Sequence, residues 1–375
     1  MSGPLSGIKV LEAGHMLAGP YCGLLLADLG AEVTKIEPAE GDIARRLGGH
    51  SVGPHNTYFA SLNRNKRSVV LDLTSAAGTA ALHELARDSH AVISNMRPAV
   101  IRKLGLTYAA LANVNPRLVC VALTGFGMES PFSDRPAYDY VIQAMTGMMT
   151  MTGAPDDPPT KAGYSAVDNS AGIMAALGLV AKIVEGRGGQ VDVAMYDVML
   201  SQMNYLASAW LNAGERARRF ASSAHPFIVP AQVFATADGW LVLFVSHDEF
   251  WARFCGEVGR PEWIVDPRFA TMEARRLNRD AVIQAVAEVL VARPATEWVE
   301  RFVSLGIVAS GIESLEDALA SEQAQVRRMV VEIPTPDGPI RAVGNPIKFD
   351  NCETQYQAPP LLGEHGRPAL TRSPA

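Results

Sequence analysis

The sequence predicts an α/β protein whose larger part is a Rossmann-like, doubly wound parallel sheet. Strand-like and helix-like segments alternate through the first 125 residues, and such alternation indicates parallel strands joined by helices on both faces. From about Arg216 the pattern changes to that of a small α+β domain, and short strands return beyond Met329. We therefore expect a large domain built from residues 1–215 and 329–375, with residues 216–328 forming a linker and the small domain.

The first strand, helix and second strand are the clearest elements. Ile8–Glu12 and Ala31–Glu37 are typical of short strands. Between them, Gly19–Leu29 has the pattern of a helix, with Pro20 suited to its first turn and Gly30 to its end. Together the three segments have the length of one βαβ unit.

The later elements follow the same signals of strand-forming runs, helix caps and glycine stops. Further strands are expected at Ser68–Leu73, Ala91–Ser94, Leu118–Leu123 and Val191–Ala194, and helices from Thr74 or Ser75 to about Asp88, at Asn169–Glu185 and at Tyr196–Leu211. In the small domain, the Asp-Gly pair of Thr236–Gly239 predicts a hairpin between Val233–Ala235 and Trp240–Val245. Helices are expected there at His247–Val258, Asn278–Val291 and Thr296–Leu305.

The composition is that of a folded protein without a preference for polyanionic partners. Of 375 residues, 48% are hydrophobic and 19% are charged, which argues against disorder of the whole chain. The formal net charge is −6, so nothing in the overall charge indicates a nucleic acid or an anionic membrane as partner.

Cysteine usage and the apolar runs predict a cytoplasmic protein without membrane association. The four cysteines are widely spaced, which favours buried, reduced thiols over a disulfide or zinc framework. They are Cys22, Cys120, Cys255 and Cys352. The N-terminus lacks the basic and apolar regions of a signal peptide. The longest apolar stretch, Ile173–Ala181, is shorter than the roughly 20 residues that cross a membrane.

The turn after the first strand lacks a dinucleotide-binding fingerprint. Gly14–Pro20 does not contain Gly-x-Gly-x-x-Gly, so Glu37, at the end of the second strand, is weak evidence for a ribose-binding acid. The start of a helix at Ala18–Pro20 nevertheless presents backbone N–H groups that suit a phosphate or a carbonyl oxygen. A plain tight turn is the alternative interpretation. No metal-binding spacing and no Gly-x-Ser-x-Gly motif occurs, so no metal site is predicted.

Asp168 has two open interpretations. It falls directly before the expected helix Asn169–Glu185, where aspartate is a preferred N-cap residue, and periodicity alone favours this role. Alternatively, the helix N-terminus keeps the carboxylate ionised with a low pKa, and such a carboxylate is a usable nucleophile toward an activated acyl group. The small residues Gly163, Ala166 and Gly172 would leave space for a ligand.

Short motifs along nearly the whole chain form a specific pattern. The first are Leu5–Glu12, Ala18–Pro20, Leu29–Glu37, Asn63–Ser68 and Leu71–Leu73. The later ones are Asn95–Pro98, Pro136–Asp139, Gly163–Gly172, Gly344–Phe349 and Pro360–His365. In this combination the chain resembles the family III CoA-transferases, the group of formyl-CoA transferase, carnitine CoA-transferase and α-methylacyl-CoA racemase.

The resemblance implies that Asp168 is the catalytic nucleophile. In the family's chemistry it attacks an acyl-CoA thioester to give a mixed anhydride, and the released CoA thiolate converts the anhydride into an aspartyl-CoA thioester. A small acceptor carboxylic acid then reverses the sequence. Coenzyme A and acyl-CoA are thus substrates, and no tightly bound cofactor is implied. The family's architecture further implies an interlocked homodimer.

The resemblance also implies where CoA is held. Arg97 and Lys103 are cations suited to the CoA phosphates, although without the resemblance a solvated basic turn is the preferred interpretation. The expected CoA contacts are Leu17, Ala18, Leu71, Asp72, Leu73, Thr74, Asn95, Met96, Arg97, Lys103, Ala137 and Tyr138.

Three departures from formyl-CoA transferase bear on the acyl group. Leu17 replaces a glutamine, and Pro38 stands where that enzyme carries a basic residue. The glycine-rich loop that shields its intermediate has no counterpart near Ser222–Pro226. We therefore expect an acyl group longer than formyl or oxalyl.

A racemase is the main alternative function. The family's racemases carry a histidine directly before the acid of the pair that is Tyr138-Asp139 here, and tyrosine, with an ordinary pKa near 10, is a poor replacement. His15 could supply a base from another loop. A non-catalytic CoA-binding protein and an NAD-type dehydrogenase are weaker alternatives.

The linker offers one hint about the substrate. Its basic residues could neutralise a dicarboxylate such as a succinyl or citramalyl group, but a run of this kind favours ordinary surface charge. They are Arg216, Arg218, Arg219 and His225.

Overall fold

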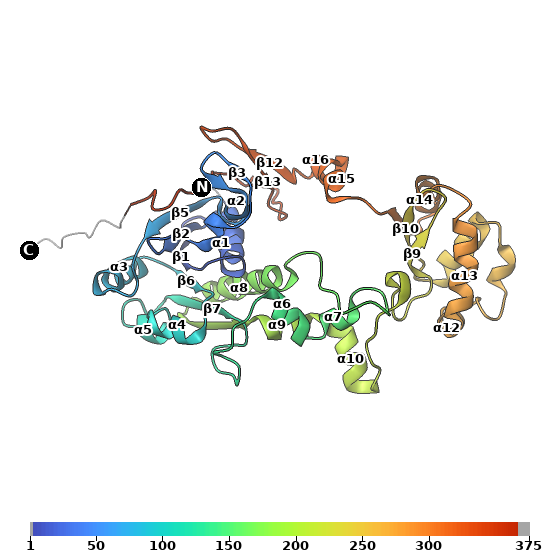
Figure 1. The fold of residues 1–375 in the computed structure, drawn as a ribbon, viewed down its shortest axis with the longest axis horizontal. Coiled ribbons are helices and arrows are strands. Elements are labelled where there is room, and N and C mark those ends of the chain that lie inside the picture. Colours follow the sequence, from blue (N-terminus) through green and yellow to red (C-terminus); the bar gives the residue numbers. More distant parts are fainter. Residues whose placement is uncertain (1–2, 367–375) are drawn as a thin grey trace, which may run out of the picture. The chain divides into compact units, whose positions relative to one another are not determined.

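The computed structural model describes residues 3–366, and contacts divide the chain into two compact units (Figure 1). Unit 1 comprises Met1–Met148, Lys161–Glu215 and Ser321–Ala375, and unit 2 comprises Met149–Thr160 and Arg216–Ala320. Unit 1 is thus formed from both ends of the chain. The assignment of residues 1–215, 216–328 and 329–375 to domains stays a prediction.

Unit 1 is built on a six-stranded parallel sheet. Its strands are β1 (Lys9–Ala13), β2 (Glu32–Glu37), β5 (Lys66–Val70), β6 (Ala91–Ser94), β7 (Val119–Thr124) and β8 (Gly189–Ala194). They lie in the order β5-β2-β1-β6-β7-β8, and every neighbouring pair is parallel. Counted along the chain, this is the order 3-2-1-4-5-6 of doubly wound sheets, whose winding reverses between β1 and β6. In such sheets, ligands bind at the carboxyl ends of the strands beside this reversal.

Helices cover both faces of this sheet, because its strands are apolar on both sides (Figure 1). Val10 and Val121 pack into one core, while their neighbours Leu11 and Cys120 pack into the other. The first layer contains α1 (Ala18–Asp28), α6 (Asp139–Met145), α8 (Ala166–Glu185) and α9 (Met195–Gln202), and the second contains α3 (Ala76–Arg87), α4 (Pro98–Lys103) and α5 (Tyr108–Leu111). The expected α/β fold with a parallel sheet is confirmed.

Two helices differ from the sequence expectation. Helix α8 begins at Ala166, earlier than expected. The segment Tyr196–Leu211, expected as one helix, is divided between α9 and α10 (Asn204–Ala213). The division occurs because the N–H of Met203 donates to the carbonyl of Leu200 in a tighter turn than that of an α-helix.

Helix α8 is long and apolar enough to cross a membrane, judged by length and composition alone. The uninterrupted run Ile173–Ala181 did not indicate this, because the neighbouring turns of α8 are also apolar on average although polar residues interrupt them. From Val167 to Leu179, however, one side of the helix is buried in the core of unit 1. A buried stripe of this kind is typical of a core helix, so length and composition are weak evidence for a span.

The end of the chain returns to the sheet edge formed by β5. After α16 (Glu322–Val326), the hairpin of β12 (Val330–Ile333) and β13 (Ile340–Val343) leads into this segment. The N–H of Asn65 donates to the carbonyl of Gln357 (3.2 Å). The N–H of His365 donates to the carbonyl of Ser68 (3.1 Å), and the N–H of Gly363 donates to Ser68 Oγ (3.0 Å). Unit 1 therefore has its edge strand bonded to residues from the far end of the sequence.

Unit 2 has a three-stranded antiparallel sheet, β11-β10-β9, and its own aromatic core. The hairpin predicted at Thr236–Gly239 forms, and the N–H of Thr236 donates to the carbonyl of Gly239 (2.9 Å). Trp251 and Phe302 lie in the core. The elements are β9 (Ala231–Ala235), β10 (Trp240–Phe244), α11 (Asp248–Glu257), α12 (Met272–Leu277), α13 (Arg279–Leu290), α14 (Ala295–Ser304), β11 (Val308–Gly311) and α15 (Leu315–Ala320).

The chain also contains several short elements and four free thiols. The remaining elements are β3 (Ser51–Val52), β4 (His55–Asn56), α2 (Thr57–Asn63), α7 (Met148–Met151) and the 3₁₀ helices Ile43–Arg46, Ala221–Ser223 and Pro261–Ile264. All four cysteines are free, and Cys22, Cys120 and Cys255 are buried as expected. Cys352 is only partly buried, because it lines a surface pocket of the returning segment.

Candidate active site

A pocket of about 90 Å³ lies at the carboxyl edge of the sheet, beside the reversal between β1 and β6. Residues that follow β1, β6 and β7 line it, together with the first turns of α1 and α8. The predicted site residues found in it are Leu17, Ala18, Asn95, Met96, Arg97, Ala137, Tyr138 and Asp168. They meet here because the carboxyl ends of parallel strands share one edge of the sheet.

A second pocket, of about 340 Å³, adjoins the first, since His15 and Met96 line both. The predicted residues in the second pocket are Leu71, Asp72, Leu73, Thr74 and Met96. Lys103 lines neither pocket. Lys103 is the last residue of α4, and its side chain is exposed. The next residue, Leu104, does line the second pocket.

Asp168 lies within the first turn of α8, and the N-cap position belongs to Ser165. The capping role that periodicity favoured for Asp168 is therefore wrong. In the described part of the chain, no donor forms a hydrogen bond with the Asp168 carboxylate, which lines the small pocket. An acid at the start of a helix is thus left available for a ligand.

A side chain from another helix accepts a hydrogen bond from a backbone N–H group at the start of α8. Asp139, in the first turn of α6, accepts hydrogen bonds from the N–H of Val167 (2.9 Å) and from Gln143 Nε2 (2.6 Å). Gln143 Oε1 in turn accepts from the N–H of Ala162 (2.9 Å). These three bonds tie the loop before α8 to α6 and so fix the position of Asp168.

Burial and a neighbouring charge control the ionisation of Asp168. Burial raises the pKa of its carboxyl to about 7, and the negative charge of Asp139 adds to the rise. The low pKa expected from the helix N-terminus is therefore wrong, because desolvation and like charge outweigh the helix dipole. At neutral pH a large share of the carboxyl is ionised, and its higher basicity makes the carboxylate a better nucleophile.

Gly172 brings α1 and α8 close together at the small pocket. A Cβ atom at this position would lie 2.9 Å from the carbonyl oxygen of Ala18, a separation that only glycine allows here. Gly172 follows Asp168 by about one helical turn. The close packing therefore sets Asp168 beside the beginning of α1.

The beginning of α1 offers backbone donors to the pocket. The helix has no side-chain cap, and within residues 3–366 the N–H groups of Leu17, Ala18 and Gly19 have no acceptor. Leu17 and Ala18 line the pocket together with Asp168. Unpaired N–H groups at a helix N-terminus are suited to a developing oxyanion.

Sequence reasoning missed several residues of this pocket, among them Tyr58, Arg135 and Met195. Burial raises the pKa of the Tyr58 hydroxyl, and Asp168 and Asp42 contribute to the rise, so the hydroxyl lies near both acids. No local pattern marks Tyr58 as a site residue. Arg135, by contrast, directly precedes the motif Pro136–Asp139 and could have been identified from it.

The basic residues of the linker make contacts within unit 2. Arg219 Nη1 donates to the carbonyls of Ala154 (2.8 Å) and Asp157 (2.6 Å). His225 Nδ1 accepts from the N–H groups of Phe227 and Ile228, both at 3.1 Å. For Arg219 and His225 these contacts favour a structural role over neutralisation of a substrate.

Comparison with known proteins gives the family. The sequence model of CoA-transferase family III matches residues 5–366. The chain is 36% identical to the succinate–glutarate CoA-transferase of Agrobacterium fabrum, covering 96% of this chain and 94% of that protein. It is 33% identical to the acetyl-CoA:oxalate CoA-transferase of Acetobacter aceti, with 97% and 94% covered. A CAIB/BAIF family protein from Brucella suis has a TM-score of 0.84 and 31% identity over 98% of both chains. The chain therefore belongs to CoA-transferase family III.

Proposed function

We propose that this enzyme moves CoA from an acyl-CoA thioester to a small carboxylic acid, with Asp168 as covalent nucleophile. One observation carries the proposal: the unpartnered carboxylate of Asp168 and the unpaired backbone N–H groups of Leu17 and Ala18 line the same pocket. Acyl transfer needs these two things together, a nucleophile and donors for the oxyanion that its attack creates.

The proposed reaction balances without any further reagent. A carboxylate oxygen of Asp168 attacks the thioester carbonyl carbon, the C–S bond breaks, and CoA leaves as thiolate from a mixed anhydride. The thiolate then attacks the aspartyl carbonyl carbon and releases the donor acid as a carboxylate. The acceptor carboxylate attacks the aspartyl-CoA thioester, and the same steps in reverse release the new acyl-CoA and restore Asp168. Each attack creates an oxyanion that the N–H groups of Leu17 and Ala18 would stabilise.

CoA would extend over the two adjoining pockets. The larger pocket, lined by Leu71–Thr74 and Met96, would take the nucleotide end, and the smaller would hold the thioester beside Asp168. Arg97, in the small pocket, and the exposed Lys103 would supply positive charge for the phosphates. Asn95, Ala137 and Tyr138 complete the proposed CoA contacts.

The exchanged acids are proposed to be small dicarboxylic acids. Of the two relatives compared above, one is named for succinate and glutarate, which are both dicarboxylates, and the other for acetyl-CoA and oxalate, of which only oxalate is a dicarboxylate. Leu17 and Pro38, which replace a glutamine and a basic residue of formyl-CoA transferase, favour an acyl group longer than formyl or oxalyl. Arg135 lines the pocket of Asp168 and would pair with the second carboxylate.

Mass spectrometry of the covalent intermediate tests the nucleophile. After incubation with succinyl-CoA, the wild-type peptide that contains Asp168 should gain the mass of CoA less one water. Asp168→Asn should gain nothing, and it serves as the matched control because it keeps the size of the side chain. A CoA adduct on another residue would contradict the proposal, and so would Asp168→Ala with wild-type transfer activity.

A 2-methylacyl-CoA racemase is the second candidate, because His15 and Asp168 line the same pocket. Burial lowers the pKa of His15, although Asp42 acts against this, so a neutral imidazole is available to accept a proton. Tyr138, which replaces the racemase histidine, is 63% exposed. Incubation of a chiral 2-methylacyl-CoA in D2O separates the candidates. Deuterium at the α-carbon without an acceptor acid would support racemisation and count against the transferase.

A second copy of the chain is the proposed partner. Helix α8 leaves Ile173, Leu177 and Val184 exposed on the side away from the core, and α10 exposes Trp210 and Leu211. Large apolar side chains exposed on two helices favour an interface over a surface left in water. Light scattering should give twice the mass of the chain. A concentration-independent single-chain mass would contradict this part of the proposal.

A further inference from the structure

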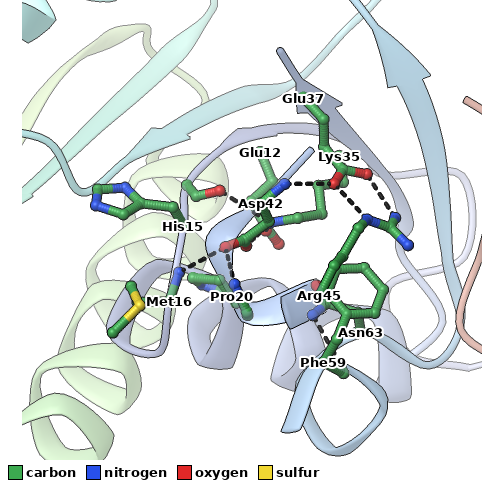
Figure 2. Close-up of polar contacts among 12 residues, drawn as sticks. Glu12, His15, Met16, Pro20, Lys35, Glu37, Asp42, Arg45, Phe59 and Asn63 are labelled. Carbon is green, nitrogen blue, oxygen red and sulfur yellow. Dashed lines mark hydrogen bonds and ion pairs between the residues drawn. The ribbon is translucent and has the colours of Figure 1, made fainter. Parts of the chain in front are cut away.

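Four buried charges lie behind the turn that connects β1 to α1. We name Glu12, Lys35, Asp42 and Lys66 the buried charge network, and their side chains are 0–1% exposed. Lys35 Nζ lies 2.9 Å from Glu12 Oε1 and 2.9 Å from Asp42 Oδ2. Figure 2 labels Lys35 together with these two acids. Lys66 Nζ lies 2.7 Å from Glu12 Oε2. Burial opposes the charge of Lys35, but Glu12 and Asp42 outweigh it and raise the pKa of Lys35, so the lysine stays protonated.

Stability alone explains this network poorly. Taking an ion out of water costs several kcal/mol, and pairing two buried ions often does no more than offset that cost. Apolar side chains of similar volume would fill the same space at least as well. The network differs from such a filling in one respect: its donors and acceptors hold backbone atoms in fixed directions.

The network holds the residues before α1. Lys35 Nζ donates a hydrogen bond to the carbonyl of Gly14 (2.8 Å). Asp42 Oδ1 accepts from the N–H of Met16 (3.1 Å), as Figure 2 shows. The chain is thus held immediately before the unpaired N–H group of Leu17.

The network also holds the first turn of α1 from the other side. Lys66 Nζ donates to the carbonyl of Pro20 (2.7 Å) and to Asn63 Oδ1 (2.9 Å). The unpaired N–H groups of Leu17–Gly19 therefore lie between two anchored points, Met16 on one side and Pro20 on the other.

The backbone between β1 and α1 needs such support, because Met16 has a φ of +62°. A residue with a side chain adopts this conformation at a cost of about 1–3 kcal/mol, and it persists only where the surroundings fix it. Asn95 adds to the restraint, since its side chain accepts from the N–H of His15 and donates to the carbonyl of His15, both at 2.9 Å.

We propose that Lys35 and Lys66 are positioning residues for CoA transfer. Through Gly14 and Pro20 they fix the turn that aims the N–H groups of Leu17 and Ala18 at the oxyanion formed beside Asp168. Neither lysine lines the two pockets, so neither contacts the substrate there. This inference rests on the proposed function, because it assigns a task to a turn of the same site.

The test removes an ion pair while it keeps the charge balanced. Glu12→Gln combined with Lys66→Met deletes one acid and one base together with the anchor on Pro20. We expect kcat to fall by about 10–100-fold while the KM for acyl-CoA changes by less than about threefold, because the misaimed donors act mainly on the oxyanion. The matched control is Asp28→Asn combined with Arg64→Met, which removes another buried pair, at the far end of α1. The control should keep kcat within about twofold whatever its loss of stability.

Hydrogen exchange gives a readout that is independent of activity. In Lys66→Met, the hydrogen-bonded N–H groups of His15 and Met16 should exchange faster, while the end of α1 stays unchanged. If Glu12→Gln/Lys66→Met has wild-type kcat and wild-type exchange in the turn, the positioning role is wrong. Asp168→Asn, assayed in parallel, separates the two proposals. Wild-type transfer by Asp168→Asn refutes Asp168 as the nucleophile of the proposed function, whereas an inactive Asp168→Asn beside fully active network variants refutes only the positioning role.

Discussion

Helices α6 and α8 each carry an aspartate in the first turn, and the two carboxylates differ in their contacts. Asp139 is buried, and its two oxygens accept hydrogen bonds from the N–H of Val167 and from Gln143 Nε2. Asp168 accepts none within the described chain and has a pKa of about 7. An aspartate in the first turn of a helix is structural in one case and available for chemistry in the other, and the difference lies in the partners that the fold supplies.

The largest expected difference between the two carboxylates is in kcat after each is replaced by its amide. Asp168→Asn should lower kcat by at least about 10³-fold, because it removes the covalent route. Asp139→Asn keeps a carbonyl oxygen for the N–H of Val167 and should lower kcat by about tenfold or less. Steady-state CoA transfer measures both variants. Equal losses would show that the two acids do not divide the work in this way.

For stability we expect the opposite order: truncation of Asp139 to alanine should cost more free energy of unfolding than truncation of Asp168. Asp139→Ala leaves the buried N–H of Val167 and the amide of Gln143 without their partner, so the free energy of unfolding should fall by about 1–3 kcal/mol. Asp168→Ala loses no hydrogen bond and should not be destabilised to this extent. Denaturant unfolding of the two variants under the same conditions checks the prediction, and a larger loss for Asp168→Ala would contradict it.

The pH dependence of the first chemical step tests whether Asp139 raises the pKa of Asp168. Only the ionised carboxylate attacks, so the rate of aspartyl-CoA formation should rise with pH through about 7. In Asp139→Asn one negative charge is gone, so the pKa of Asp168 falls and the rise should move to lower pH. Single-turnover rates between pH 5 and pH 9 measure both profiles. An unshifted profile in Asp139→Asn would mean that Asp139 does not act on Asp168.

The smallest expected effect is on thermal stability. Because the pKa of Asp168 in the folded state is above its unfolded value of about 3.9, the folded state holds its proton longer, and stability is lost as the pH rises from about 4 to about 7. Asp168→Asn has no carboxyl at this position and so does not lose this stability. The difference in Tm between Asp168→Asn and wild type should therefore be a few degrees more positive at pH 8 than at pH 4. A difference that does not depend on pH would contradict the raised pKa.

Local signals in the sequence predicted most of the sheet. Ala91–Ser94 forms a strand with the expected bounds, and Ser75 caps α3 as one of the two expected residues. The start of α8 was missed because its N–H at Val167 is satisfied by Asp139, which is 28 residues earlier in the chain. A rule based on neighbouring residues has no means of detecting such a cap.

The candidate site also has features that the sequence predicts and features that it does not. Asn95 directly follows β6 and lies at the carboxyl edge that parallel strands share, whereas Ala137, well beyond the end of β7, was expected at the site only through the family resemblance. The pKa of Asp168 could not be predicted from the sequence, because it depends on burial and on the position of Asp139. The role proposed for Lys66 could not be predicted either, because its partners Glu12 and Pro20 are distant in the sequence.

The return of the chain end to β5 has a consequence for aggregation and for folding order. An edge strand with unpaired N–H and C=O groups is a template for other strands, and here the chain's own residues occupy part of that edge at Asn65 and Ser68. The residues that cover Asn65 follow it by 292 positions. During synthesis this edge therefore stays open until residues 357–365 have been added, and a protein truncated before Gln357 would keep it open permanently.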